Sequence, residues 1–222
     1  MRFLRGISAV VAKDLQAEFR SRFAFNTVMT FVGSALLLIL FTLRAQQLPP
    51  TPKSGLVWIV ILFAALSVLS RSFITETDRQ TYDLLRLYGQ PTEVYIGKFS
   101  YNFLFTFTIN IIIFVLYILL LDLSVVEPLA LILVLFLGSA GLSSVSTMLG
   151  AIVSQADRRG AIFSVLSIPL LFPLILILVR ATAAAVFNGL QGDFLNDVMA
   201  LVGFAGVTLT AGILLFDYIW TE

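Results

Sequence analysis

One long stretch between two apolar runs, Glu76 to Lys98, carries many charges of both signs in a sequence otherwise built largely of hydrocarbon side chains. Its apolar residues recur every three or four positions, which predicts one face of a short helix ending near Gly89 and Pro91. These apolar residues are Tyr82, Leu84, Leu85, Leu87 and Tyr88. The charged residues around them are Glu76, Asp78, Arg79, Asp83 and Arg86. We expect the apolar face to lie against the membrane and the charged face to bind a partner in solution.

Most catalytic chemistry is excluded by composition. The chain has no cysteine for a disulfide or thiolate metal site, and no histidine for base catalysis or heme ligation. Ser143, Ser144 and Ser146 therefore lack a base that could activate them. The phosphate-binding motif G-x-x-x-x-G-K-[ST] also fails, because Phe99 follows Gly97-Lys98 and Thr92 stands where the first glycine belongs. The chain is not expected to hydrolyse ATP itself.

Composition predicts an all-α integral membrane protein. Apolar residues make up 59% of the 222 residues and charged residues only 12%, whereas a soluble domain has about 25% charged residues. Six runs approach the length of about 20 residues that crosses a bilayer. They are Phe23–Leu43, Gly55–Ile74, Tyr101–Leu121, Pro128–Val153, Ala161–Val179 and Val198–Ile219. Residues 1–22 instead have a striped apolar pattern, which predicts an amphipathic helix in the membrane interface or, alternatively, packed on a partner protein.

The basic residues predict the orientation of these spans. Of the 14 lysines and arginines, five precede the first span, four flank the loop after the second and two, Arg158 and Arg159, follow the fourth. Only Arg44, Lys53 and Arg180 fall on the other side. The positive-inside rule therefore predicts that both termini and the charged stretch lie in the cytoplasm.

Polar and small residues within the spans predict how the helices pack. Asn102 and Asn110 are expected to bond to another helix. Small residues at four-residue spacing in the fourth span, among them Ser139, Ser143 and Thr147, favour close helix packing over a substrate path. Pro169 and Pro173 predict a bend in the fifth span. No acidic residue lies in the middle of a span, which argues against a proton-coupled transporter.

Several short motifs, in their order and spacing along the chain, resemble those of a known family of membrane proteins. They are Lys13-Asp14-Leu15 with Glu18, Arg20, Ser21 and Arg22; Phe73 with Glu76; Tyr82–Leu87; Gly97-Lys98; Gly138–Leu142; Met148–Gly150; Arg158-Arg159; and Ile168–Leu176. Over nearly its whole length the chain resembles the heme exporter protein B (CcmB-type) permease subunits of cytochrome c maturation, a branch of the ABC-2 type transporters.

The resemblance implies one permease domain over residues 1–222 of the bacterial inner membrane, with an interfacial helix at 1–22, a cytoplasmic coupling-helix loop at 75–99 and an external segment at 180–197. Two copies would pair with two ATPase subunits, which would use the ATP, and would work with a heme-handling membrane protein and a periplasmic heme chaperone. The implied ATPase-coupling residues are Glu76, Asp78, Arg79, Tyr82, Asp83, Leu85 and Arg86. Arg158 and Arg159 would form a second cytoplasmic loop. Heme would be a handled or transported ligand, with no cofactor bound directly, no metal site and no nucleic-acid partner.

Two alternatives stay open at this point. The chain could belong to an ABC-2 exporter of another amphipathic substrate, such as a lipid or a drug. It could also be a membrane scaffold that recruits partners without transport. For residues 180–197, Phe187–Gly192 is predicted to be a turn and Ala181–Val186 helical, and the segment is expected to cap the bundle rather than bind a periplasmic partner.

Overall fold

The computed structural model describes residues 2–43, 48–68, 73, 76, 89–154, 159–190 and 192–221. The described ranges form helices and contain no β-strand. In chain order the helices are α1 (Arg2–Ser21), α2 (Phe23–Leu43), α3 (Pro50–Val68), α6 (Pro91–Leu121), α7 (Pro128–Val153), α8 (Arg159–Ala183), the short π-helix η1 (Ala184–Asn188) and α9 (Phe194–Thr221).

Six helices in the described part of the chain are long and apolar enough to cross a membrane, as predicted. Helices α2 and α7 have the predicted bounds, whereas α6 begins at Pro91 rather than at Tyr101. A proline in the first turn of a helix loses no internal hydrogen bond. The negative charge of Glu93 in that turn stabilises the helix, because it lies at the positive end of the helix dipole. The first turns of α6 therefore take up residues 91–98 of the predicted loop.

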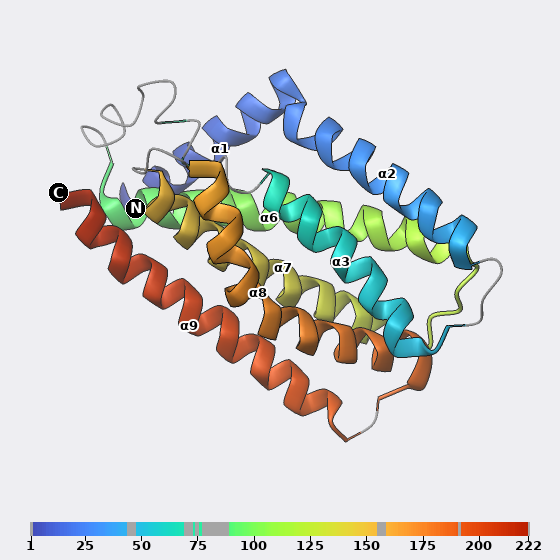
Figure 1. The fold of residues 1–222 in the computed structure, drawn as a ribbon. Helices are drawn as coiled ribbons and strands as arrows, with labels where there is room; N and C mark the ends of the chain where they lie inside the picture. Colours follow the sequence, from blue (N-terminus) through green and yellow to red (C-terminus); the bar gives the residue numbers. More distant parts are fainter. Residues whose placement is uncertain are drawn as a thin grey trace.

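Helix α7 lies at the centre of the bundle and packs against α6, α8 and α9 (Figure 1). A Cβ atom on Gly138 would come within 2.7 Å of Trp58, and one on Gly141 within 2.8 Å of Leu174. These glycines let α3 and α8 approach α7 closely, so the small residues of this span serve helix packing within the chain, as predicted. Helices α2 and α9 lie at the periphery and expose many apolar side chains, as expected for surfaces that face lipid.

A sharp corner separates α1 from α2. Arg22 has a φ of 52°, in the left-handed region that ends a helix. The carboxylate of Glu18 accepts a hydrogen bond from the backbone N–H of Phe25 at 2.9 Å, which caps the first turn of α2. This corner lets α1 run along the first turns of α6 instead of continuing the direction of α2 (Figure 1).

Helix α8 contains Pro169 and Pro173 and bends along its course, as predicted (Figure 1). It continues into η1, whose carbonyl groups accept backbone hydrogen bonds from the loop before α7. Val126 donates to Val186 at 3.2 Å and Glu127 to Ala185 at 2.9 Å. Gly189, with a φ of 75°, then ends the helical segment where a turn was predicted.

Candidate functional site

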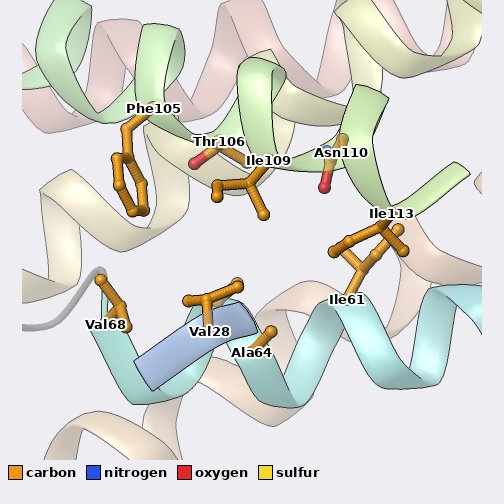
Figure 2. Close-up of a pocket in the computed structure, with 10 residues that line it drawn as sticks. Val28, Ile61, Ala64, Val68, Phe105, Thr106, Ile109, Asn110 and Ile113 are labelled. Carbon is orange, nitrogen blue, oxygen red and sulfur yellow. The ribbon is translucent and has the colours of Figure 1, made fainter. Parts of the chain in front are cut away.

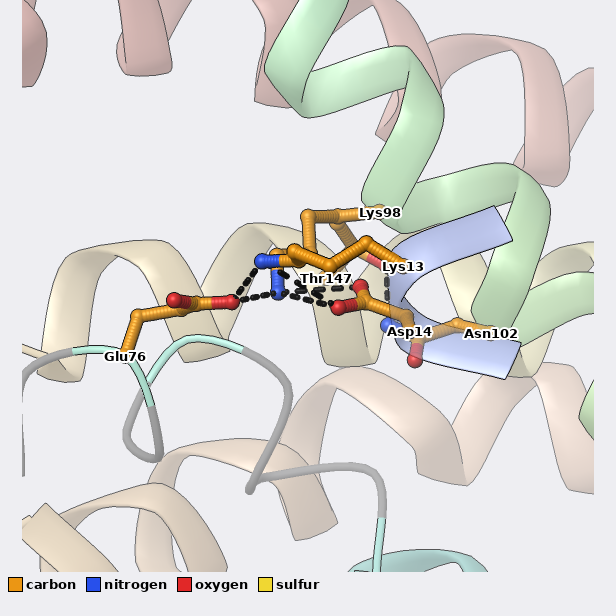
Figure 3. Close-up of polar contacts among 6 residues, drawn as sticks. All are labelled: Lys13, Asp14, Glu76, Lys98, Asn102 and Thr147. Carbon is orange, nitrogen blue, oxygen red and sulfur yellow. Dashed lines mark hydrogen bonds and ion pairs between the residues drawn. The ribbon is translucent and has the colours of Figure 1, made fainter. Parts of the chain in front are cut away.

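Four charged side chains from three parts of the chain meet beside the first turns of α6. The Lys98 ammonium lies 2.9 Å from Asp14 Oδ2 and 2.9 Å from Glu76 Oε1. Lys13 lies 3.4 Å from Asp14 Oδ1 and also pairs with Glu76 Oε1. Figure 3 shows the two ammonium groups between the two carboxylates. We refer to these four residues as the ionic cluster.

Lys98 is the most deeply buried member of the ionic cluster, with 1% of its surface exposed. Removing an ammonium group from water costs several kcal/mol, and only well-placed opposite charges offset that cost. Two lysines and two acids give the cluster a formal charge of zero. The geometry of the cluster therefore allows Lys98 to stay buried. It also means that each carboxylate needs the positive charge of the lysines beside it to offset the cost of its own burial.

Lys13 lies at the more exposed edge of the ionic cluster. Burial disfavours its charged form, but the nearby carboxylates of Asp14 and Glu76 outweigh that effect and raise the pKa of Lys13 above 10.5. Lys13 therefore keeps its positive charge throughout the physiological pH range.

Small residues bring α1 close enough to α6 for these ion pairs to form. A Cβ atom on Gly97 would lie 2.7 Å from Val10 Cβ and 3.3 Å from the carbonyl oxygen of Ile7. A Cβ atom on Gly6 would collide with the side chain of Glu93. Two glycines, one from each helix, thus permit a contact that larger residues would prevent.

A polar contact one turn further along α6 lies next to the ionic cluster. Asn102 Nδ2 donates to Thr147 Oγ1 of α7 at 2.9 Å, and both side chains are buried (Figure 3). Asn110, two turns beyond Asn102, donates to Ser139 Oγ of α7 at 2.9 Å. The prediction that both asparagines bond to another helix is confirmed. Elements α1, α6 and α7 and Glu76 are therefore joined by adjacent polar contacts.

Among the residues predicted to couple to an ATPase, the structure describes Glu76, whose carboxylate points inward to Lys13 and Lys98. The others, Asp78, Arg79, Tyr82, Asp83, Leu85 and Arg86, lie outside the described residues, as does Arg158. Arg159 is the first residue of α8. The roles predicted for these residues stay predictions.

The sequence interpretation assigned no site role to Lys13, Asp14 or Lys98. It used the two lysines as cytoplasmic charges that set the orientation, and it placed Asp14 on the polar face of an interfacial helix. A signal was available in α6, because Lys98, Asn102, Thr106 and Asn110 recur every four residues and therefore share one helix face. The contacts across the cluster join residues 22 to 84 positions apart, so only the folded chain shows them.

These features define a multi-pass, all-helical membrane permease with an amphipathic N-terminal helix held against its bundle. The family model described as CcmB protein matches residues 5–216, which is nearly the whole sequence. The chain belongs to the CcmB family, whose members are permease components of heme exporters in cytochrome c maturation. No curated protein matches the chain closely enough to count as a relative.

Proposed function

We propose that this chain is the membrane subunit of an ABC heme exporter and that residues 75–99 couple it to a separate ATPase. Two copies of the chain would assemble with two ATPase subunits. ATP hydrolysis would then drive heme delivery, or release of a heme-loaded chaperone, on the far side of the bacterial inner membrane. A heme-handling membrane protein and a periplasmic heme chaperone complete the proposed set of partners.

The ionic cluster is the observation that best supports coupling through this segment. Glu76 opens the stretch proposed to contact the ATPase, and it pairs with Lys98 of α6 and Lys13 of α1. A displacement of the segment would therefore act on both helices, through the buried Lys98 of α6 and the more exposed Lys13 of α1. Glu76 would transmit the movement from inside the protein, and the charged residues Asp78, Arg79, Asp83 and Arg86 would provide the surface that binds the ATPase. Tyr82 and Leu85 would hold the coupling helix against the membrane side.

Turnover of the co-purified complex tests this proposal. We expect Tyr82→Ala and Leu85→Ala to weaken assembly with the ATPase, because each removes part of the apolar face that would hold the proposed coupling helix in place while its charged face binds the ATPase. Glu76→Gln should leave the complex assembled but reduce the chaperone release obtained per ATP hydrolysed. Glu127→Gln, a carboxylate change in the loop before α7, serves as the control. If Tyr82→Ala, Leu85→Ala and Glu76→Gln all leave assembly, turnover and release unchanged, coupling through residues 75–99 is contradicted.

The proposed orientation places both termini and the loop with Arg158 and Arg159 in the cytoplasm. Single cysteines at positions 158 and 159 can be introduced into this naturally cysteine-free chain. In intact cells they should resist a membrane-impermeant thiol reagent, whereas a cysteine at Asn188 should react. Ready labelling at 158 or 159 from outside would overturn the orientation.

A further inference from the structure

Helix α1 packs on the bundle with one side and leaves the opposite side open. Gly6, Val10 and Asp14 recur every four residues on the packed side and lie next to the first turns of α6. On the open side, Leu4 and Phe19 have 69% and 75% of their surface exposed. The open side of α1 therefore carries large apolar side chains that the described part of the bundle does not cover.

The place of α1 in the fold brings its open side to the membrane. Helix α1 ends at Ser21, and α2, the first helix apolar enough to cross a bilayer, begins at Phe23. The left-handed corner at Arg22 turns the chain between the two helices (Figure 1). Helix α1 thus starts from the level at which α2 enters the bilayer, which is the level of the lipid headgroups.

A lipid can meet the chain at this level only from outside the bundle. The pocket between α6 and the pair α2 and α3 is lined mainly by apolar side chains, with Val28 from α2 and Ile61 from α3 (Figure 2). Its volume is about 20 Å³, which is close to the size of a single water molecule. An acyl chain does not fit there, so lipid contact falls on outward surfaces such as the open side of α1.

An exposed arginine follows each of the two exposed apolar residues. Leu4 precedes Arg5 near the start of α1, and Phe19 precedes Arg20 near its end. Successive residues of a helix point about 100° apart, and the two pairs lie roughly 22 Å apart along the axis. When the apolar residue of a pair enters the acyl chains, its arginine lies at the edge of that contact and can reach the headgroups. The pattern occurs at both ends of the helix.

These arginines have no acidic partner within the described part of the chain. The guanidinium groups of Arg5, Arg20 and Arg22 make no ion pair or hydrogen bond with it. Both acids of α1 are engaged elsewhere, since Asp14 belongs to the ionic cluster and Glu18 caps the first turn of α2. The open side of α1 is left with an excess of positive charge, which is complementary to a negatively charged lipid surface.

We propose that the open side of α1 binds anionic phospholipids. Leu4 and Phe19 enter the acyl chains, while Arg5, Arg20 and Arg22 pair with headgroup phosphates, to which a guanidinium can donate two parallel hydrogen bonds. A zwitterionic headgroup carries its own cation beside the phosphate and is therefore bound less well. Anionic lipid and the ionic cluster hold opposite sides of the same helix. This binding requires neither an ATPase partner nor a particular orientation of the chain in the membrane.

Energy transfer in nanodiscs measures which lipids gather around α1. Gln16 is exposed, and helical spacing puts it on the same side of α1 as Arg5 and Arg20. Gln16→Cys therefore gives a single site for a donor fluorophore in this cysteine-free chain. The full chain is placed in phosphatidylcholine nanodiscs that contain equal small amounts of acyl-labelled phosphatidylglycerol or acyl-labelled phosphatidylcholine as acceptor. Each arginine near an anionic surface strengthens binding about fivefold, so the ratio of transfer to phosphatidylglycerol over phosphatidylcholine should exceed one.

Arginine variants show whether this preference comes from α1. Arg5→Gln combined with Arg20→Gln should move the ratio toward one, whereas Arg180→Gln, at an exposed arginine of the opposite end, should leave it unchanged. Equal transfer to the two acceptors in the chain with its natural arginines would overturn the proposal. So would a ratio unaffected by the double substitution, or lowered as much by Arg180→Gln. The comparison of the two lipids is decisive even if the double variant does not fold.

Discussion

The two ends of the bundle are held together by different kinds of interaction. At one end, the ionic cluster joins α1, α6 and Glu76 through full charges, of which Lys98 and Glu76 are buried and Lys13 is 43% exposed. At the other end, the contacts between segments are mainly neutral hydrogen bonds. Tyr117 donates to the carbonyl of Lys53 at 2.8 Å, and Trp58 Nε1 donates to Thr182 at 2.8 Å. An ion pair is present there too, between Arg180 and Asp197 at 2.7 Å, but the Arg180 side chain is 65% exposed.

The two ends differ in the free energy that is lost when one of these contacts is broken. A buried charge that loses its partner is strongly unfavourable, whereas a lost neutral hydrogen bond costs about 1 kcal/mol. An exposed ion pair contributes less still. The end with the ionic cluster is thus the end at which a local displacement has the larger effect on the neighbouring helices. This fits the proposal that the ATPase acts there.

The largest effect is expected from Lys98→Met, which leaves Asp14 and Glu76 short of one buried positive charge. We predict a loss of about 3–5 kcal/mol in the free energy of unfolding in detergent micelles. The matched control is Lys53→Met at the other end, where the lysine lies 5.8 Å from the Phe187 ring centre and its removal should cost about 1 kcal/mol or less. Equal losses in the two variants would remove the distinction between the ends.

A smaller effect at the same end is expected from Gly97→Ala. The added methyl group would meet Val10 at 2.7 Å and must push α1 away from α6. Overpacking of this kind costs about 1–3 kcal/mol, and the separation should also lengthen the ion pairs of Lys98. Gly33→Ala in α2 is the control, because its new Cβ would meet nothing within 4 Å. The comparison uses thermal unfolding of both variants, and a melting temperature unchanged by Gly97→Ala would contradict the close contact.

The smallest effect is expected at the opposite end from Trp58→Phe. This change keeps a buried aromatic ring, which packs on Phe114 with a centroid distance of 5.7 Å, but it removes the hydrogen bond to Thr182. We predict a loss of about 1–2 kcal/mol in the free energy of unfolding. Chaperone release per ATP hydrolysed should stay at the wild-type value, in contrast to Glu76→Gln. A loss as large as that of Lys98→Met would show that the two ends are equally sensitive.

The sequence by itself determined the membrane class and the number of spans, because hydrocarbon length and apolar composition are local properties of the chain. It also placed Asn102 and Asn110 correctly in contact with another helix. The start of α6 was not predicted, since the sequence interpretation used Gly89 and Pro91 only as the stop of a preceding helix and began the span at Tyr101, whereas α6 begins at Pro91. Proline can mark either boundary, and the residues around it do not decide which.

Only the tertiary structure decided that Lys13, Asp14, Glu76 and Lys98 form one site. In the sequence each reads as a solvated charge at a membrane surface, which is the usual state of such residues. Their burial depends on the left-handed corner at Arg22 and on the close contact of Gly97 with Val10, which together bring α1 against α6. Charges far apart in the sequence interact strongly only when the fold excludes water from between them, and that exclusion is a property of the packed helices.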